Sequence, residues 1–424
     1  MESSTIALII VGVAIVFFAT EIVPLPVTAI GAAFAMAIFG VISFGDAVAG
    51  FGHDVPMLLM GSLIMGEALI ETGAAQKFGG NIVRLVGTDQ RLFTTAIFIL
   101  ASFLSAFMSN TIVVAAMMPI VAAIAATSGG KIKKKYTFMA IGIAANMGGS
   151  LTLIATSTNL LGQAILAESG ETVMSFFDLT VGSLPRIIFI ALFYFTIGQK
   201  IQKKVFTFKE VATEADFPMG TEKNNKRNYK MWVTVVIFVL MISGFISSIW
   251  TMGTVAMLAA MLCISLGCIS MKDALRRIDW SSILLIGGSL GFAEGLQSSG
   301  AGELVAQRFL GLLGDNVSAF ALLILFTIIA VVMANIMSSS ATILILGPIG
   351  VFMFQSIGYE PRMVIMALIW SINLAFATPI GTTPITLTLA GGYRFTDYTK
   401  VGGLLVVACV IITILTYPLI FPLF

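Results

Sequence analysis

Four short polar breaks interrupt long apolar segments of this 424-residue sequence. Hydroxyl and amide side chains make up most of these breaks, and none of them contains a charged residue. They are Ser109-Asn110-Thr111, Thr156-Ser157-Thr158-Asn159, Ser338-Ser339-Ser340 and Thr382-Thr383-Pro384. Such groups suit an anion or a partly dehydrated sodium ion, because hydrogen bonds and carbonyl-type oxygens satisfy both without a fixed charge. One such break is more often a contact between membrane helices, whereas four at matched positions indicate a binding site.

Other chemistries lack the residues that they need. His53 is the only histidine, which excludes zinc sites, histidine-based triads and histidine proton relays. Cys263, Cys268 and Cys409 lie in apolar segments, where a free cysteine acts as a small hydrophobic residue. An intramembrane protease would need a nucleophile with a base or a pair of aspartates, and the acidic residues near the spans are mostly glutamates. We therefore expect no enzyme, and the net charge of +2 gives no indication of nucleic-acid binding.

The elements that carry these breaks are membrane helices. Hydrophobic residues make up 58% of the chain and charged residues 10%, whereas a soluble domain carries roughly 25% charged residues. Apolar segments of about 20 residues, each long enough to cross the hydrocarbon core, recur along nearly the whole length. Their continuous apolar runs favour helices over a transmembrane barrel, whose strands alternate. The composition predicts an all-α polytopic protein of the lipid bilayer, and we expect a multi-pass protein of the cell inner (plasma) membrane.

The sequence contains an internal duplication. A constant shift of 227 residues relates polar and glycine positions of the two halves. The matched pairs are Asp46 with Asp273, Ser62 with Ser289, Glu67 with Glu294, and Gly73 with Gly300. Further along, 107–120 parallels 336–349 at a shift of 229, and 152–158 parallels 378–384 at a shift of 226. We interpret 1–200 and 231–424 as two repeats, joined by a polar cytoplasmic linker at 201–230.

Each repeat is predicted to contain five transmembrane helices and one re-entrant helical hairpin. The hairpins are 92–126 and 317–356, and broken helices follow at 137–165 and 363–391. As one straight helix, 92–126 would be about 52 Å long, far more than one crossing needs. As hairpins, these segments place 20 of the 23 basic residues on the cytoplasmic side, the exceptions being Arg186, Arg308 and Arg362. The second repeat is then inverted relative to the first, and both termini lie outside.

Two carboxylates remain open to two interpretations. Glu67 and Glu294 occupy equivalent positions of the two repeats, within or at the edge of apolar segments. Ionisable groups within a membrane are functional candidates by default. Both lie near helix ends, however, so a structural or snorkelling role is at least equally well supported.

The motifs around the breaks resemble a known family. These are "SNT" at 109–111, "TLIATSTNL" at 152–160, "ATPIGTTP" at 377–384 and "GGYRFTDYTKVG" at 391–402. Together they are similar to the divalent-anion/sodium symporter family, the SLC13-like branch of the ion transporter superfamily. The resemblance covers nearly the full chain. It implies a homodimer in which each protomer has a scaffold domain and a transport domain that moves as an elevator.

The resemblance also implies roles for the residues at the breaks. Ser105, Ser109 and Asn110, with the loop near Ala155, match a first sodium site. Ser339 and Thr378 would belong to a second sodium site. The residues expected to line the substrate are Ser109, Asn110, Thr111, Thr156, Ser157, Thr158, Ser338, Ser339, Ser340, Thr382 and Thr383.

The second half departs from the family pattern at two positions of its hairpin. Ser339 stands where the asparagine of a Ser-Asn-Thr tip is expected, and Ala334 replaces a hydroxyl residue one turn earlier. Both changes remove an oxygen ligand and would weaken the second sodium site. The number of sodium ions, and sodium dependence itself, therefore stay open.

These features together favour a secondary active transporter of small anions, above all di- or tricarboxylates, coupled to sodium or to protons. The main alternative keeps the fold and makes the chain a sodium/proton antiporter or an arsenite-type oxyanion exporter of the same superfamily. That alternative requires an essential titratable group, for which Glu67 and Glu294 are the candidates. An ion channel is disfavoured, because two inverted hairpins fit alternating access better than a symmetric pore.

Overall fold

A computed structural model describes residues 2–74, 87, 89–208, 228–313 and 318–420. In this part of the chain all regular structure is helical, and eight helices are long and apolar enough to cross a membrane. The chain is therefore an all-α polytopic membrane protein, as its composition predicts. Parts of three predicted elements lie outside the described residues. They are most of the linker, at 209–227, position 317 of the second hairpin, and the end of the second repeat, at 421–424.

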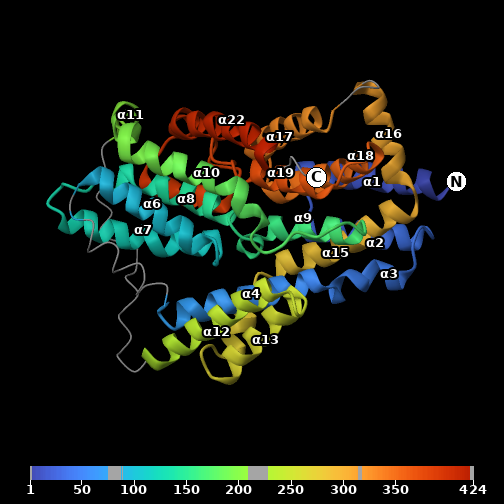
Figure 1. Ribbon diagram of the computed structural model, residues 1–424, viewed down its shortest axis with the longest axis horizontal. Coiled ribbons are helices and arrows are strands. Elements are labelled where there is room, and N and C mark those ends of the chain that lie inside the picture. The colour runs from blue at the N-terminus through green and yellow to red at the C-terminus, as the bar shows by residue number, and fades with distance from the viewer. Residues whose placement is uncertain (1, 75–86, 88, 209–227, 314–317, 421–424) are drawn as a thin grey trace.

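The first half contains the helices α1 to α11 (Figure 1). Their bounds are α1 (Ser3–Thr20), α2 (Leu25–Ile38), α3 (Phe44–Ala49), α4 (Asp54–Glu71), α6 (Gln90–Ser105), α7 (Asn110–Thr127), α8 (Phe138–Gly149), α9 (Ser157–Glu168), α10 (Asp178–Phe193) and α11 (Gln199–Val205). α6 and α7 pack against each other and form the two arms of the predicted hairpin. The predicted broken helix consists of α8 and α9, and the 150–156 segment between them holds a short 3-10 turn at Leu153–Ala155.

The second half contains α12 to α22. Their bounds are α12 (Asn228–Ser247), α13 (Met252–Ser265), α14 (Met271–Arg277), α15 (Trp280–Ser298), α16 (Ala301–Leu313), α17 (Ala319–Ile336), α18 (Ser339–Ser356), α19 (Arg362–Ile372), α20 (Thr383–Leu387), α21 (Phe395–Asp397) and α22 (Gly403–Ile420). α17 and α18 pack together as the arms of the second predicted hairpin. α19 and α20 are the two pieces of the second predicted broken helix.

Capping residues explain why new helices begin at the breaks. The Ser338 hydroxyl accepts a hydrogen bond from the backbone N–H of Ala341, and the Thr156 hydroxyl accepts one from that of Asn159. These bonds satisfy donors that the first turn of a helix leaves unpaired. At these two breaks a hydroxyl residue therefore stabilises the start of the next helix.

The helices form two groups that meet around the breaks (Figure 1). α4 packs on α13 and α2 packs on α15, in the group that also contains α3 and α12. In the other group α6 packs on α8 and α17 packs on α19. α9 contacts both groups, since it packs on α15 as well as on α18 and α19.

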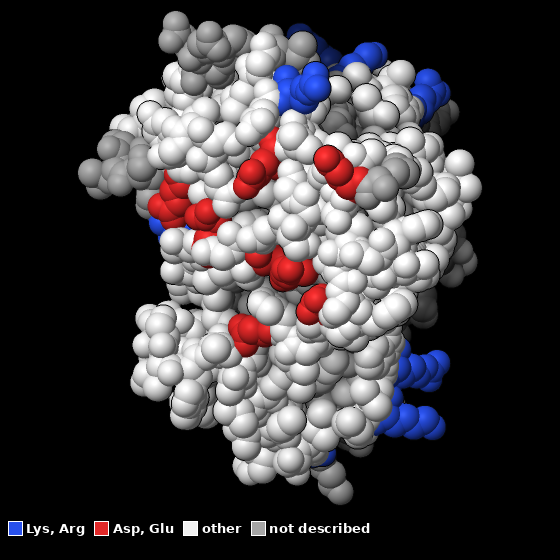
Figure 2. All heavy atoms as spheres, turned by 90° about the vertical axis from the view of Figure 1, so that its right-hand side faces the viewer, with Lys and Arg blue, Asp and Glu red and all other residues white. Residues whose placement is uncertain are grey.

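Charged side chains differ between the two ends of the molecule. The view from the right-hand side of Figure 1 shows Asp and Glu side chains gathered over the middle of that face, with Lys and Arg near its edges (Figure 2). α11, which carries Lys200, Lys203 and Lys204, lies at the opposite, left-hand end in Figure 1. A gathering of lysines on one side is the asymmetry that orients membrane proteins.

Candidate functional site

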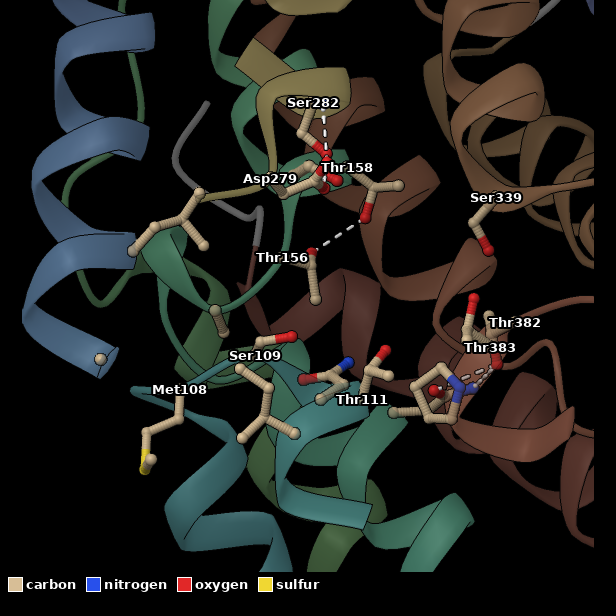
Figure 3. Close-up of a pocket in the computed structure, with 18 of the residues that line it drawn as sticks. Met108, Ser109, Thr111, Thr156, Thr158, Asp279, Ser282, Ser339, Thr382 and Thr383 are labelled. Atoms are coloured by element: carbon tan, nitrogen blue, oxygen red, sulfur yellow. Dashed lines mark hydrogen bonds between the residues drawn. The ribbon is translucent and has the colours of Figure 1, made fainter. Parts of the chain in front are cut away.

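All four breaks line one cavity of about 510 Å³. Its wall contains every residue that the sequence predicts to contact the substrate. These are Ser109, Asn110, Thr111, Thr156, Ser157, Thr158, Ser338, Ser339, Ser340, Thr382 and Thr383. Ala155 also lines the cavity, whereas Ser105 and Thr378 are not part of its lining. The close-up shows side chains from both halves of the chain facing the same space (Figure 3).

Helix ends converge on this cavity from both halves. α7 begins at Asn110, α9 at Ser157 and α18 at Ser339, so three long helices present N-terminal turns to it. The N-cap residue of α7, Ser109, makes no side-chain capping bond, unlike Thr156 and Ser338. N-terminal turns carry free N–H groups and a partial positive charge, and they favour anions. The cavity can therefore bind negative charge without a basic side chain at the breaks.

The first-half residues predicted to hold sodium lie together. The Ser105 hydroxyl donates a hydrogen bond of 2.6 Å to Oδ1 of Asn110, and both side chains are buried. Asn159, at the fourth position of the second break, is fully buried and donates through Nδ2 to the carbonyl oxygens of Gly149 and Thr152. Its Oδ1 has no hydrogen-bond partner in the described part of the chain.

An unpaired, buried amide oxygen is costly and is what a hard cation uses as a ligand. The donor set of this half, made of hydroxyl and amide oxygens, therefore fits sodium. Asn159 belongs to the second break, but the sequence alone did not indicate that it could bind the ion.

The second-half residues predicted to hold sodium are already engaged in hydrogen bonds. The Thr378 hydroxyl donates to the backbone oxygen of Asn335 at 2.7 Å, and the Ser339 hydroxyl donates to the Ile372 carbonyl at 3.2 Å. Asn335, next to Ala334, is buried and supplies an amide that the sequence analysis missed. Its Oδ1 accepts from the N–H of Ala377 at 2.9 Å. The oxygen ligands of this half thus tie the hairpin to the following loop.

Two asparagines on the cavity wall were missed as well. Asn146 lies in the last turn of α8, and Asn373 is the C-cap residue of α19. Nδ2 of Asn146 lies 2.9 Å from the Thr382 hydroxyl, which links the first broken helix to the last break. The positions of Asn146 and Asn373 differ by 227, the shift of the repeat, so a complete comparison of the two halves would have found both asparagines.

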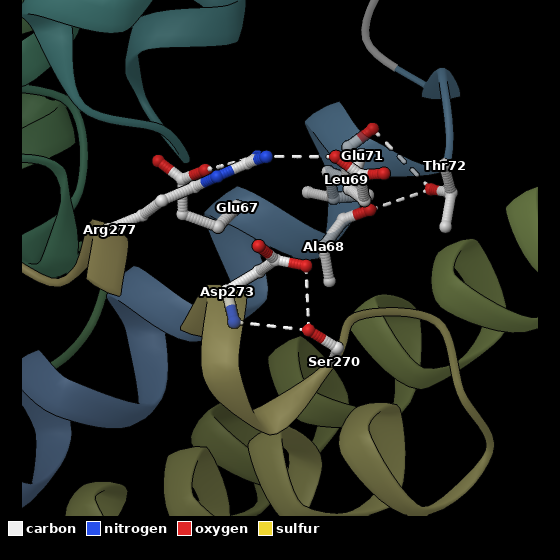
Figure 4. Close-up of polar contacts among 8 residues, drawn as sticks. All are labelled: Glu67, Ala68, Leu69, Glu71, Thr72, Ser270, Asp273 and Arg277. Carbon is white, nitrogen blue, oxygen red and sulfur yellow. Dashed lines mark hydrogen bonds and ion pairs between the residues drawn. The ribbon is translucent and has the colours of Figure 1, made fainter. Parts of the chain in front are cut away.

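The charged residues of the cavity come from the group of helices that contains α4 and α15. Glu21 follows α1, Glu67 is on α4, Arg277 ends α14 and Asp279 precedes α15. Arg277 pairs with Glu67 at 3.4 Å and with Glu71 at 3.2 Å (Figure 4). Partial burial lowers the pKa of Arg277, but the two carboxylates outweigh it and the net shift is upward. Glu294, the repeat partner of Glu67, does not line the cavity.

Comparison with known proteins places the chain in a family. The sequence model of a family described as citrate transporter matches residues 15–361. The chain belongs to the citrate transporter family. It is therefore a membrane transporter and not an enzyme.

The sequence similarity between this citrate transporter family member and its relatives extends over most of both chains. A sodium-dependent high-affinity dicarboxylate transporter of Caenorhabditis elegans is 24% identical, with 94% of this chain and 80% of that protein covered. The sodium-dependent dicarboxylate transporter SdcS of Staphylococcus saprophyticus is 24% identical over 88% and 77% of the two chains. The resemblance to divalent-anion/sodium symporters predicted from the motifs is confirmed.

Solved structures of other transporters share the fold of this family member. MtrF of Neisseria gonorrhoeae has a TM-score of 0.67 at 14% identity, with 98% of this chain and 95% of that chain covered. The YdaH transporter of Alcanivorax borkumensis has a TM-score of 0.66 at 14% identity, with 89% of each chain covered. At this level of identity, the likeness concerns the fold alone.

Proposed function

We propose that this protein is a secondary active transporter that couples the movement of small di- or tricarboxylates to sodium. The observation that carries the proposal is the single cavity in which all four uncharged breaks meet. The names of its dicarboxylate-transporting relatives support the substrate class. Two or three carboxylates can be held by N-terminal helix turns and hydroxyl groups, with sodium supplying positive charge.

The proposed sodium site lies in the first half. Asn110 and Asn159 provide amide oxygens, Ser105 and Ser109 provide hydroxyl oxygens, and the loop near Ala155 provides backbone oxygens. Sodium would replace the Ser105 hydrogen as the partner of Asn110 Oδ1. Among the described residues, the first half has a buried amide oxygen without a hydrogen-bond partner, Asn159 Oδ1, and the second half has none. Asn335 Oδ1 accepts from the Ala377 N–H. We infer one sodium site for each chain.

Transport is proposed to follow an elevator mechanism in a homodimer of the plasma membrane. The hairpins and broken helices form the mobile domain, and α2, α4, α13 and α15 belong to the scaffold. The two repeats are proposed to be inverted, with α6 and α7 entering from the cytoplasmic side and α17 and α18 from outside. The lysines of α11 support this orientation.

Uptake into proteoliposomes tests the proposal. We expect labelled succinate or citrate to accumulate when sodium is higher outside, and to stay near background when potassium replaces sodium. Asn110→Ala should raise the sodium concentration needed for half-maximal uptake at least tenfold, because it removes an amide oxygen of the ion site. Thr399→Ala is a matched control, since its exposed hydroxyl lies outside the cavity.

Accumulation driven equally well by a proton gradient without sodium would contradict sodium coupling. Failure of every di- and tricarboxylate to accumulate or exchange would contradict the proposed function. A normal sodium response of Asn110→Ala would contradict the first-half ion site.

A further inference from the structure

A fully buried arginine lies inside the bundle, away from the cavity wall. Arg186 is on α10 and has no exposed surface. The predicted topology places it among the few basic residues that are not cytoplasmic, and the structure buries it between α10 and α19. The indole of Trp370 packs against it, with the guanidinium carbon 5.8 Å from the ring centroid. Gly182 permits this approach, because a Cβ there would lie 2.4 Å from the same indole ring.

No carboxylate in the described part of the chain forms an ion pair with Arg186. Its bonds go to neutral oxygens instead. Nε donates to the Gly182 carbonyl at 3.0 Å, and the two terminal nitrogens donate to the Trp370 carbonyl at 2.8 Å and to the Ser183 hydroxyl at 3.0 Å. A buried charge without a countercharge is strongly unfavourable and is rarely kept without a function.

Arg186 is linked to the ends of both broken helices, to α19 directly and to α8 through Ser183. Trp370 is in the last turn of α19, three residues before Asn373 on the cavity wall. The Ser183 hydroxyl donates in turn to the carbonyl of Ser150, the C-cap residue of α8. C-terminal helix ends carry a partial negative charge, which would repel an anion in the cavity. Arg186 therefore lies behind both negative helix ends that face the cavity.

We propose that Arg186 is a specificity-determining residue whose buried charge offsets the C-terminal ends of α8 and α19 and favours substrates with two carboxylates. It acts through the helix ends and does not touch the substrate. This inference rests on the proposed function of the cavity. At an effective dielectric constant of about 20, a unit charge about 10 Å away changes the binding of another unit charge about tenfold.

The test compares a dianion with a monoanion of nearly the same shape. Succinate and succinamate differ in one carboxylate, which is an amide in succinamate. We would measure labelled succinate uptake in proteoliposomes and its inhibition by each compound. Arg186→Gln should reduce the preference for succinate over succinamate about tenfold.

Two further variants separate charge from packing. Arg186→Met fills a similar volume without a polar group, so it replaces Arg186→Gln as the neutral variant if that protein does not fold. Its preference for succinate over succinamate should also fall about tenfold. Arg362→Gln is the matched control, because Arg362 begins the same α19 but pairs with Asp178 and Glu360. Its succinate preference should equal that of wild type.

The outcomes distinguish this inference from the function on which it rests. Absence of wild-type succinate uptake would refute the proposed function. Wild-type uptake with an unchanged preference in Arg186→Gln or Arg186→Met would refute only the role of Arg186. Misfolding of both neutral variants would assign the residue to structure and overturn the inference.

Discussion

Substitution of Gly149 gives a sharp test of the proposed ion site. Gly149 is the last residue of α8, where the helix end meets the first two breaks. A Cβ at this position would lie 2.5 Å from Nδ2 and 3.0 Å from Oδ1 of Asn110, and 2.8 Å from the Thr156 methyl group. Gly149→Ala therefore cannot fit unless the Asn110 amide or the helix end moves.

The size of the effect follows from this displacement. Ordinary van der Waals contact begins at 3.4 Å, so the Asn110 amide must move by about 0.9 Å, which is enough to break its short bond to Ser105. A misplacement of about 1 Å at a binding constellation costs up to about a hundredfold in rate. We expect Gly149→Ala to lower sodium-driven succinate uptake between tenfold and a hundredfold, together with a weaker apparent sodium affinity.

Initial rates in proteoliposomes, measured over a series of sodium concentrations, provide the assay. Gly31→Ala is the matched control, since Gly31 is also helical and an added Cβ there would have no neighbour within 4 Å. Thermal unfolding in detergent shows whether the variant remains folded. A folded Gly149→Ala protein with wild-type uptake and sodium affinity would refute the assignment of Asn110 to the ion site.

Three further predictions concern groups around the cavity. Glu67→Gln and Glu294→Gln should retain sodium-driven uptake in proteoliposomes. Loss of transport in both variants would favour the antiporter alternative. Asn335→Ala should destabilise the protein by about 1–3 kcal/mol in thermal or denaturant unfolding, because the partners of its buried amide are left unpaired. The Hill coefficient of this variant for sodium should stay near one. Glu21→Gln should strengthen apparent succinate affinity about two- to fivefold. In the wild type the Glu21 carboxylate accepts a hydrogen bond from the Ser338 N–H at the α18 N-terminus and so competes with a substrate carboxylate for that helix end. Weaker affinity in binding or uptake assays would contradict this competition.

The breaks and their helices were predictable because their signals are local. Polar runs that recur at matched positions of the two halves indicate that one helix ends and another begins there, twice in each half. The common cavity was expected from the resemblance, and all eleven predicted substrate residues line it. The predictions are least complete where contacts join residues far apart in the sequence.

Arg186 and Asn335 illustrate that limit. Nothing in the residues next to Arg186 indicates that its guanidinium reaches the Trp370 carbonyl, 184 positions away. Likewise, the change to Ser339 removes an amide from the hairpin tip, and only the fold shows that Asn335 brings another to the loop after α19. Such packing depends on how helices meet, which the spacing of polar residues does not specify.

The charges around the cavity bear on the order in which ions bind. Glu21, Glu67 and Asp279 provide three carboxylates on the charged wall, against the single guanidinium of Arg277. This excess of negative charge attracts sodium and repels a dianion that approaches an empty cavity. A bound sodium ion together with the buried charge of Arg186 would balance two carboxylates. We therefore expect sodium to bind first. In equilibrium binding assays, raising sodium should lower the Kd for succinate, and raising succinate should lower the Kd for sodium by the same factor.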